Sequence, residues 1–274
     1  MNEIFGFDAF SPKEIAEKVE NVGVAKARLP LLSMLMLAIL AGAFIGLGAL
    51  YFVVVKSDPT MGFAARQVLG GVAFALGLIL VIIAGAELFT GNNLLVMAWA
   101  DRKISTFELV RSWWIVCLGN FIGAIGLTVL VYLSHHPDMN QGAIAREYIS
   151  IAGAKISMPF WTAFFRGVLC NALVCLAVWM ALAGRSVVDK AVAIVFPISA
   201  FVAAGFEHSV ANMYLIPMAM LLQFGGATHE TVASITWLNF LDNLLPVLAG
   251  NLIGGTVFVG LVYHIIYHRN QNFG

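Results

Sequence analysis

The chain has 274 residues, of which 61% are hydrophobic and 11% charged, and its formal net charge is zero. With a mean hydropathy of +0.91, this composition excludes an ordinary soluble globular domain and predicts an integral membrane protein. The three cysteines lie in apolar segments without metal-ligand spacing, so we expect neither a disulfide framework nor a metal site. We also expect no cofactor and no nucleic-acid partner.

The first 28 residues predict a short helix. Residues 11–14 (Ser-Pro-Lys-Glu) combine an N-cap serine, a proline at the first helical position and a glutamate that completes a capping box. Ile15, Val19 and Val22 follow at helical spacing, so the helix is amphipathic and is expected at the cytoplasmic surface, where it could anchor the chain or take part in gating. Since the first apolar run starts only near Leu29, no secretory signal is predicted.

Six apolar segments follow, each long enough to cross a hydrocarbon core of about 30 Å as a helix, which takes about 20 residues. They cover residues 29–55, 67–99, 112–137, 156–183, 190–222 and 243–268, and the fourth is interrupted by Arg166. The sequence therefore predicts an all-α integral membrane protein with six transmembrane helices. Its channel domain covers residues 29–268, and residues 269–274 form a short cytoplasmic tail.

The loops between these segments carry an uneven share of positive charge. With the N-terminus inside, ten lysines and arginines fall on the cytoplasmic side and four on the outer side, if Arg166 is left out because it lies within a segment. The positive-inside rule then places both termini in the cytoplasm.

The second and fifth segments share the pattern Gly-x-Glu-x-x-x-x-Asn, in residues 85–92 and 205–212. A carboxylate within a membrane span costs several kcal/mol, with estimates from about 2.5, unless it faces a cavity or a partner. Irregular backbone at that depth needs protein or water to satisfy it. We expect both helices to break here, at Gly85, Glu87, Gly91, Asn92, Gly205 and Asn212, and we expect Glu207 to lie on the substrate pathway. The carboxylates could bind loop N–H groups and hold the breaks in shape; two kinked helices with a structural glutamate are the alternative.

A second pattern supports an internal repeat. Residues 119–123 and 250–254 both read Gly-Asn-x-x-Gly, and such glycine pairs permit close approach of helices. Each half of the chain is thus a plain span, a broken span and a span with this motif. Because three is odd, the second half is inverted relative to the first, which predicts a 3+3 inverted repeat with two broken helices.

The residues at which the two octets differ are candidates for chemistry. His208 follows Glu207 on the predicted pathway, and its imidazole could offer a proton or a positive charge to a small anion, or could bond neighbouring helices as a neutral ring. Thr90 is its candidate partner across the pseudo-twofold axis, or a helix cap. Asn171 could touch the substrate or His208. Lys155 could attract anions to the outer mouth, or lie at the membrane interface.

Four apolar side chains flank the breaks and would form constrictions, although ordinary packing could explain each of them: Phe74, Leu78, Leu88 and Phe201. Six spans with two re-entrant breaks is also the plan of aquaporin-like channels. However, no asparagine here precedes a proline, so the paired Asn-Pro-Ala caps of those channels are missing. This absence disfavours a channel for water or other neutral solutes.

Together, these motifs resemble the formate–nitrite transporter family over nearly the whole chain, through residues 85–91, 167–180, 205–213, 243–247 and 250–251. The resemblance implies an aquaporin-like protomer and a homopentamer with one pore per subunit, in a bacterial cytoplasmic membrane. It implies passage of small monovalent anions together with protons. It also implies that Thr90 and His208 form the pore centre, with Asn171 and Lys155 nearby and the four apolar side chains at the constrictions.

Within the family, residues 184–186 with 189–190, 205–208 and 245–247 look like the formate channel branch, whereas Gly91, where formate channels often have serine, looks more like the nitrite branch. We therefore expect formate as the substrate, with nitrite or hydrosulfide as alternatives. Protonated His208 could stabilise the anion or give it a proton, so that the neutral acid crosses the second apolar ring. No Gly-x-Ser-x-Gly or His-Glu-x-x-His motif favours an intramembrane enzyme. A purely structural protein would leave the mid-membrane Glu-His pair unexplained.

Overall fold

The computed structural model describes residues 9–229 and 232–267, and every regular element among them is helical. The predicted tail of residues 269–274 lies outside the described residues. Five helical stretches are long and apolar enough to cross a membrane: Leu31–Lys56, Phe63–Gly85, Thr106–Leu133, Phe160–Ala183 and Trp237–Tyr267. The predicted fifth span is divided into α8 (Val187–Ala203) and α9 (Ser209–Phe224), as a broken helix requires. The all-α membrane architecture is thereby confirmed.

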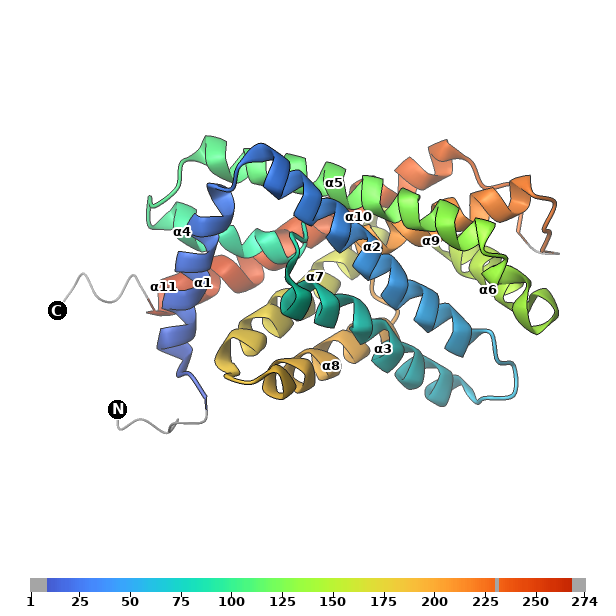
Figure 1. Cartoon of the computed structure of the whole chain (residues 1–274), viewed down its shortest axis with the longest axis horizontal. Helices are drawn as coiled ribbons and strands as arrows, with labels where there is room; N and C mark the ends of the chain where they lie inside the picture. The colour runs from blue at the N-terminus through green and yellow to red at the C-terminus, as the bar shows by residue number, and fades with distance from the viewer. Residues whose placement is uncertain (1–8, 230–231, 268–274) are drawn as a thin grey trace.

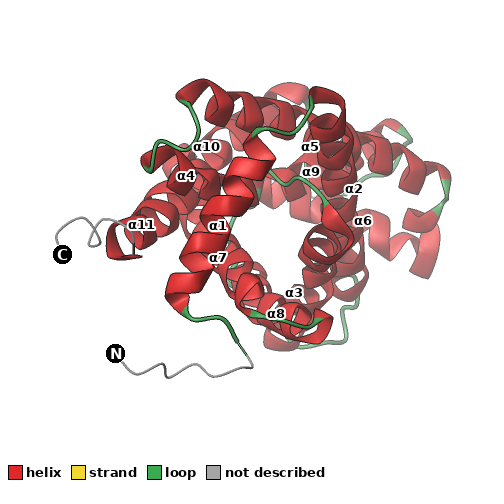
Figure 2. Cartoon of the chain, turned by 60° about the vertical axis from the view of Figure 1, so that its left-hand side comes forward, coloured by secondary structure: helices red, strands yellow, loops and turns green. Residues whose placement is uncertain are grey.

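The N-terminal helix is α1 (Pro12–Ala27), and it begins with the predicted capping box between Ser11 and Glu14. Ile15 and Val19 are buried, and the helix packs against α7 (Phe160–Ala183), α4 (Val96–Ala100) and the 3₁₀ turn Gly91–Leu95 (Figure 2). Glu20 is also buried and meets the Lys103 ammonium at 2.8 Å. Burial raises the pKa of the Glu20 carboxyl, and a hydrogen bond with Asp101 adds to this effect. The helix is therefore held to the helical domain by apolar and charged contacts.

The third and sixth predicted spans each begin six residues earlier than expected. The third predicted span is α5 (Thr106–Leu133), and the sixth begins with α10 (Trp237–Gly255). Each has a capping box in its first turn, formed by Ser105 with Glu108 and by Thr236 with Asn239. The span boundaries at 112 and 243 are wrong because the prediction excluded these polar turns, which stabilise the helix starts.

An additional helix, α6 (Met139–Ile156), occupies a segment for which no helix was predicted. Its residues 140–142 have left-handed backbone, and the regular helix follows them. Ile144, Tyr148 and Ala152 are fully or almost fully buried at a spacing of four residues. This pattern is that of an amphipathic helix, and it was missed because the segment carries charges and is too polar for a span.

The two halves of the chain repeat the same helix order. In the first half α1 is followed by α2 (Leu31–Lys56), α3 (Phe63–Leu80), a break, α4 and α5; in the second half α6 is followed by α7, α8, a break, α9 and α10. A π-helical turn, Val81–Gly85, ends α3, and another, Thr256–Leu261, joins α10 to α11 (Val262–Tyr267). Helix α2 packs on α5, α7 packs on α10, and α3 packs on α8 between the halves.

The two halves also point in opposite directions. Helices α1 and α11 lie at one end of the molecule, whereas α6 lies towards the other end (Figure 1). The predicted 3+3 inverted repeat is thus confirmed, and each repeat contains a further helix before its first span.

Glycines allow the paired helices to approach closely, as the Gly-Asn-x-x-Gly motif predicts. A Cβ atom at Gly123 would lie 1.9 Å from the Ile39 carbonyl oxygen, and one at Gly250 would lie 2.1 Å from that of Phe164. Both obstacles are backbone atoms, which a rotamer change cannot move.

We expect Gly123→Ala and Gly250→Ala each to destabilise the folded protein by about 1–3 kcal/mol or more, because the added methyl group forces α5 from α2 or α10 from α7. The measurement is the thermal unfolding midpoint in detergent. Gly126→Ala is the matched control, since Gly126 lies on α5 with no atom within 4 Å of the added Cβ. Equal losses in all three variants would contradict this account.

Candidate functional site

The two broken helices end at glycines with left-handed backbone. Gly85 has a φ of +87° and Gly205 a φ of +71°, and at both positions the space around an added Cβ is empty. Conformation rather than crowding therefore requires glycine at these two positions. After each glycine the chain runs without regular structure up to Thr90 or His208 before helical turns resume.

Two asparagines satisfy the backbone at these breaks. Asn120 Nδ2 donates to the carbonyl oxygens of Ala38 (2.8 Å) and Glu87 (2.9 Å), and its Oδ1 accepts from Phe89 N–H at 2.9 Å. Asn251 makes the same contacts in the second half, with Gly167 O (2.9 Å), Glu207 O (2.9 Å) and Ser209 N–H (2.9 Å). Both side chains are completely buried. Each amide thus joins a broken helix to a neighbouring span.

The octet carboxylates are also paired alike in both halves. Glu87 accepts from Asn92 Nδ2 at 2.7 Å and forms an ion pair with Lys26 at 3.0 Å. Glu207 accepts from Asn212 Nδ2 at 2.7 Å and forms an ion pair with Lys155 at 2.9 Å. The expectation that the carboxylates bind loop N–H groups is wrong, because Asn120 and Asn251 take that role. Each glutamate instead accepts a hydrogen bond from the last asparagine of its octet, which lies where helical structure resumes after the break.

Lys26, near the end of α1, was not predicted as part of the site. It is the counterpart of Lys155, which lies near the end of α6, so the repeated helices each supply one ammonium group. Lys155 does line a cavity, but its charge is compensated by Glu207 at 2.9 Å and only 14% of its side chain is exposed. The predicted role of Lys155 in attracting anions to the outer mouth stays a prediction, for a charge that Glu207 already offsets.

The structure brings Thr90 and His208 together at the centre. Thr90 Oγ1 lies 3.1 Å from His208 Nε2, and both residues are buried. Thr90 makes no capping hydrogen bond with its own helical turn, so the alternative role as a cap is wrong. His208 is the N-cap of α9, and its Nδ1 accepts from Ala211 N–H at 3.1 Å. Because Nδ1 is the acceptor, the neutral ring carries its proton on Nε2, directed at Thr90.

Asn171 lies beside this pair but has other partners. Its Nδ2 is 3.2 Å from Thr90 O, 2.7 Å from Asn93 Oδ1 and 2.6 Å from Asn251 O, and the residue is fully buried. No bond joins it to His208 among the described residues. In this geometry Asn171 fixes the carbonyl of Thr90, and contact with a substrate stays a prediction.

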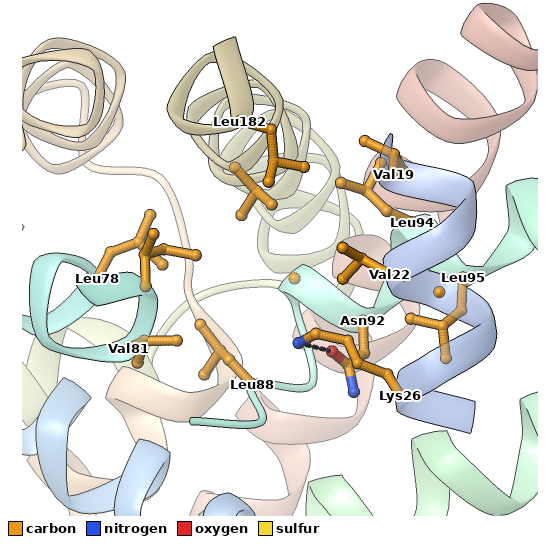
Figure 3. Close-up of a pocket in the computed structure, with 14 residues that line it drawn as sticks. Val19, Val22, Lys26, Leu78, Val81, Leu88, Asn92, Leu94, Leu95 and Leu182 are labelled. Carbon is orange, nitrogen blue, oxygen red and sulfur yellow. Dashed lines mark hydrogen bonds between the residues drawn. The ribbon is translucent and has the colours of Figure 1, made fainter. Parts of the chain in front are cut away.

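Two cavities approach the pair from opposite ends. The α1 cavity, of about 40 Å³, is lined by residues of α1 together with Leu78 and Leu88 (Figure 3). The α6 cavity, of about 230 Å³, is lined by Phe74, Phe201 and His208. Phe201 stacks on the imidazole with ring centroids 5.9 Å apart, and Phe74 meets Phe201 edge to face. All four predicted constriction residues are at most 4% exposed. Leu78 and Leu88 line the α1 cavity and Phe74 and Phe201 line the α6 cavity, and their role as constrictions stays a prediction.

The cavities differ in charge. Among the described residues, Lys26 is the one charged side chain that lines the α1 cavity, and it donates to Asn92 Oδ1 (Figure 3). It also pairs with Glu87. The α6 cavity is lined by Lys56, Lys155, Arg166 and Glu207. Within the described residues no group of three or more histidines, cysteines or carboxylates could hold a metal ion.

We expect Asn251→Asp to destabilise the protein by about 1–3 kcal/mol for each buried carbonyl that loses its donor. A carboxylate still accepts from Ser209 N–H, but its second oxygen would face the carbonyl oxygens of Gly167 and Glu207. The measurement is the thermal unfolding midpoint. Asn239→Asp is the control, because the Asn239 side chain accepts from Thr236 through Oδ1 in the α10 capping box, and a carboxylate can accept the same bonds. A loss of stability no greater than that of the control would contradict the role of Asn251.

Comparison with known proteins adds independent evidence. A family profile described as "Formate/nitrite transporter" matches residues 13–265. The chain is 39% identical to "Formate channel FocA" of Escherichia coli K12 over 277 aligned positions, with 97% of each chain covered. It is 44% identical to "Uncharacterized transporter YrhG" of Bacillus subtilis, covering 95% of this chain and 94% of that protein. A solved structure titled "Pentameric formate channel with formate bound" superimposes with a TM-score of 0.81 at 40% identity, over 86% of this chain and 97% of its own.

Proposed function

Because the chain belongs to the formate/nitrite transporter family, we propose that it conducts small monovalent anions across a membrane, with formate as the substrate. The observation that carries this proposal is the Thr90–His208 pair, buried between two apolar layers with a cavity on either side. The 39% identity to a protein named as a formate channel, over 97% of both sequences, supports formate in particular.

The geometry favours a mechanism centred on Nε2 of His208. An anion cannot cross the layers of Phe74 with Phe201 and of Leu78 with Leu88 without losing hydration that apolar side chains do not replace. In the space between them, the Nε2–H of His208 can turn from Thr90 Oγ1 to a carboxylate oxygen, and the Thr90 hydroxyl can donate a second bond. These two donors would offset part of the lost hydration.

Proton transfer to formate requires the imidazolium form. In the geometry observed, the added proton on Nδ1 would face Ala211 N–H, which now donates to that nitrogen. Protonation therefore requires His208 to leave its position as the cap of α9. A permeating anion that pairs with the imidazolium would offset this loss, so protonation and anion entry are coupled, and the neutral acid crosses the second layer.

The proposal extends to assembly and location. The solved relative is a pentamer, and many large apolar side chains of this chain are exposed, including Trp114, Leu130 and Phe196. We infer a homopentamer in the bacterial cytoplasmic membrane, with one pore per protomer. The distribution of lysine and arginine supports a cytoplasmic location for α1 and both termini, and with this orientation the α1 cavity opens inward and the α6 cavity outward.

The primary test compares formate, nitrite and hydrosulfide flux in proteoliposomes made with the same protein. We expect formate flux to be the fastest and to exceed that of protein-free liposomes. Faster nitrite or hydrosulfide flux would change the substrate but keep the family mechanism. Osmotic water flux without anion flux would favour an aquaporin-like channel for neutral solutes, the alternative of a different class.

His208→Asn tests the mechanism. Asparagine is a good N-cap, so its Oδ1 can accept from Ala211 N–H and preserve α9. Wild-type formate flux should rise as the pH falls from about 7 to 5, because more imidazolium is available to pair with the anion. The variant should lose this rise, and flux should change by less than about twofold over the same interval, after subtraction of permeation through the bilayer. If the variant keeps the wild-type pH profile, His208 has no part in proton coupling.

A further inference from the structure

We propose that the α6 cavity contains a second anion-binding site, formed by Lys56 and Arg166, which binds a small carboxylate or oxyanion before it reaches His208. This inference rests on the proposed function and concerns a step at the mouth of the pathway. It assigns to two other residues the role that the sequence analysis gave to Lys155.

The site is motivated by the difference between the two halves of an otherwise symmetrical molecule. At the symmetrical positions, Lys26 and Lys155 each neutralise one octet glutamate. Lys56 and Arg166 are additional, and both line the α6 cavity. Since the Lys155–Glu207 pair has no net charge, these two side chains give the α6 cavity a positive charge that the α1 cavity lacks.

Both side chains are held at the entrance to the second break. Lys56 Nζ donates to Gln67 Oε1, and Gln67 Nε2 donates to the Ala203 carbonyl at 3.0 Å. An Arg166 guanidinium nitrogen donates to the Gly205 carbonyl at 3.4 Å. The ammonium and the guanidinium are therefore tied to residues 203–205, directly before Glu207. Arg166 makes this one side-chain hydrogen bond within the described part of the chain, so further guanidinium N–H donors remain for an anion.

Neighbouring carboxylates do not neutralise the positive charge of Lys56 and Arg166. Glu147 on α6 lies within electrostatic reach of Lys56, but Arg66 on α3 and His229 also act on that carboxylate. Glu147 does not line the cavity, where Glu207 is the one carboxylate and is already paired. An anion that enters the cavity therefore meets two cations and no free carboxylate among the described residues.

The chemistry selects small anions with two adjacent acceptor oxygens. A guanidinium can donate two parallel N–H bonds to a carboxylate or a planar oxyanion, and an ammonium adds a point charge. At about 230 Å³ the cavity can hold formate with part of its water. Such a site raises the anion concentration on the α6 side only, so the pathway should have unequal apparent affinities from its two ends.

The test removes the two charges together in Lys56→Gln/Arg166→Gln. In oriented membrane vesicles at low ionic strength, we expect the formate concentration for half-maximal entry from the α6 side to rise by about fivefold to tenfold, while entry from the α1 side stays unchanged. The difference between the double variant and wild type should disappear near 1 M salt, where the Debye length is about 3 Å. Arg166→Lys should lie between wild type and the double variant, because the charge remains but the two parallel N–H donors are lost.

Arg146→Gln is the matched control. Arg146 also lies on α6, but it does not line the cavity and bonds only the Gln141 carbonyl among the described residues. Its removal changes the net charge of the same end without changing the site, so half-maximal entry should stay within about twofold of wild type.

A direct measurement of formate binding tests the Lys56–Arg166 site independently of formate transport. Broadening of the ¹³C-formate signal by detergent-solubilised protein should weaken in the double variant and persist in Arg146→Gln. If the double variant matches wild type in both binding and half-maximal entry while formate flux persists, the Lys56–Arg166 site is wrong and the proposed function stands. If wild-type protein conducts no formate, the proposed function fails, and the binding comparison still decides whether the two residues hold an anion.

Discussion

The structure depends on the satisfaction of backbone polar groups where two helices break within a membrane. Water can do this at a protein surface, but lipid offers no hydrogen bonds, so other parts of the chain must supply them. Asn120 and Asn251 do so from the neighbouring spans, each through both donors and its acceptor. Close approach of the spans at Gly123 and Gly250 lets the amides reach across. In the Gly-Asn-x-x-Gly motif, the glycines let the spans approach and the asparagine bonds the backbone of the break, so both parts of the motif stabilise the broken helix.

Symmetry and asymmetry have separate roles in this molecule. The repeated glycine, glutamate and asparagine create two matching irregular segments, each with an ammonium supplied by an amphipathic helix. At their junction the symmetry is lost, because one half offers a hydroxyl and the other an imidazole that also caps a helix. The scaffold can tolerate this difference, since the carboxylates and asparagines that stabilise the breaks do not include Thr90 or His208.

Much of this arrangement could be predicted from the sequence because membrane constraints act locally. A carboxylate within an apolar segment is costly, so the two glutamates predicted the helix breaks. The residues at which the two octets differ then predicted the Thr90–His208 pair. Helix α6 was not predicted because its charged residues exclude a membrane span, although Ile144, Tyr148 and Ala152 follow a helical period. The Lys26–Glu87 pair was not predictable, because α1 and the first break are far apart in sequence and nothing in either segment specifies the other.

One consequence concerns the status of α1. Among the described elements, α6 lies between the spans α5 and α7, and α1 precedes the span α2. Yet Lys26 of α1 is the counter-ion of Glu87, a carboxylate only 6% exposed at the centre of the first break. Detachment of α1 would leave that anion uncompensated in a poorly solvated place. The amphipathic helix α1 is thus part of the cavity wall, and the charge balance of the first break depends on its position.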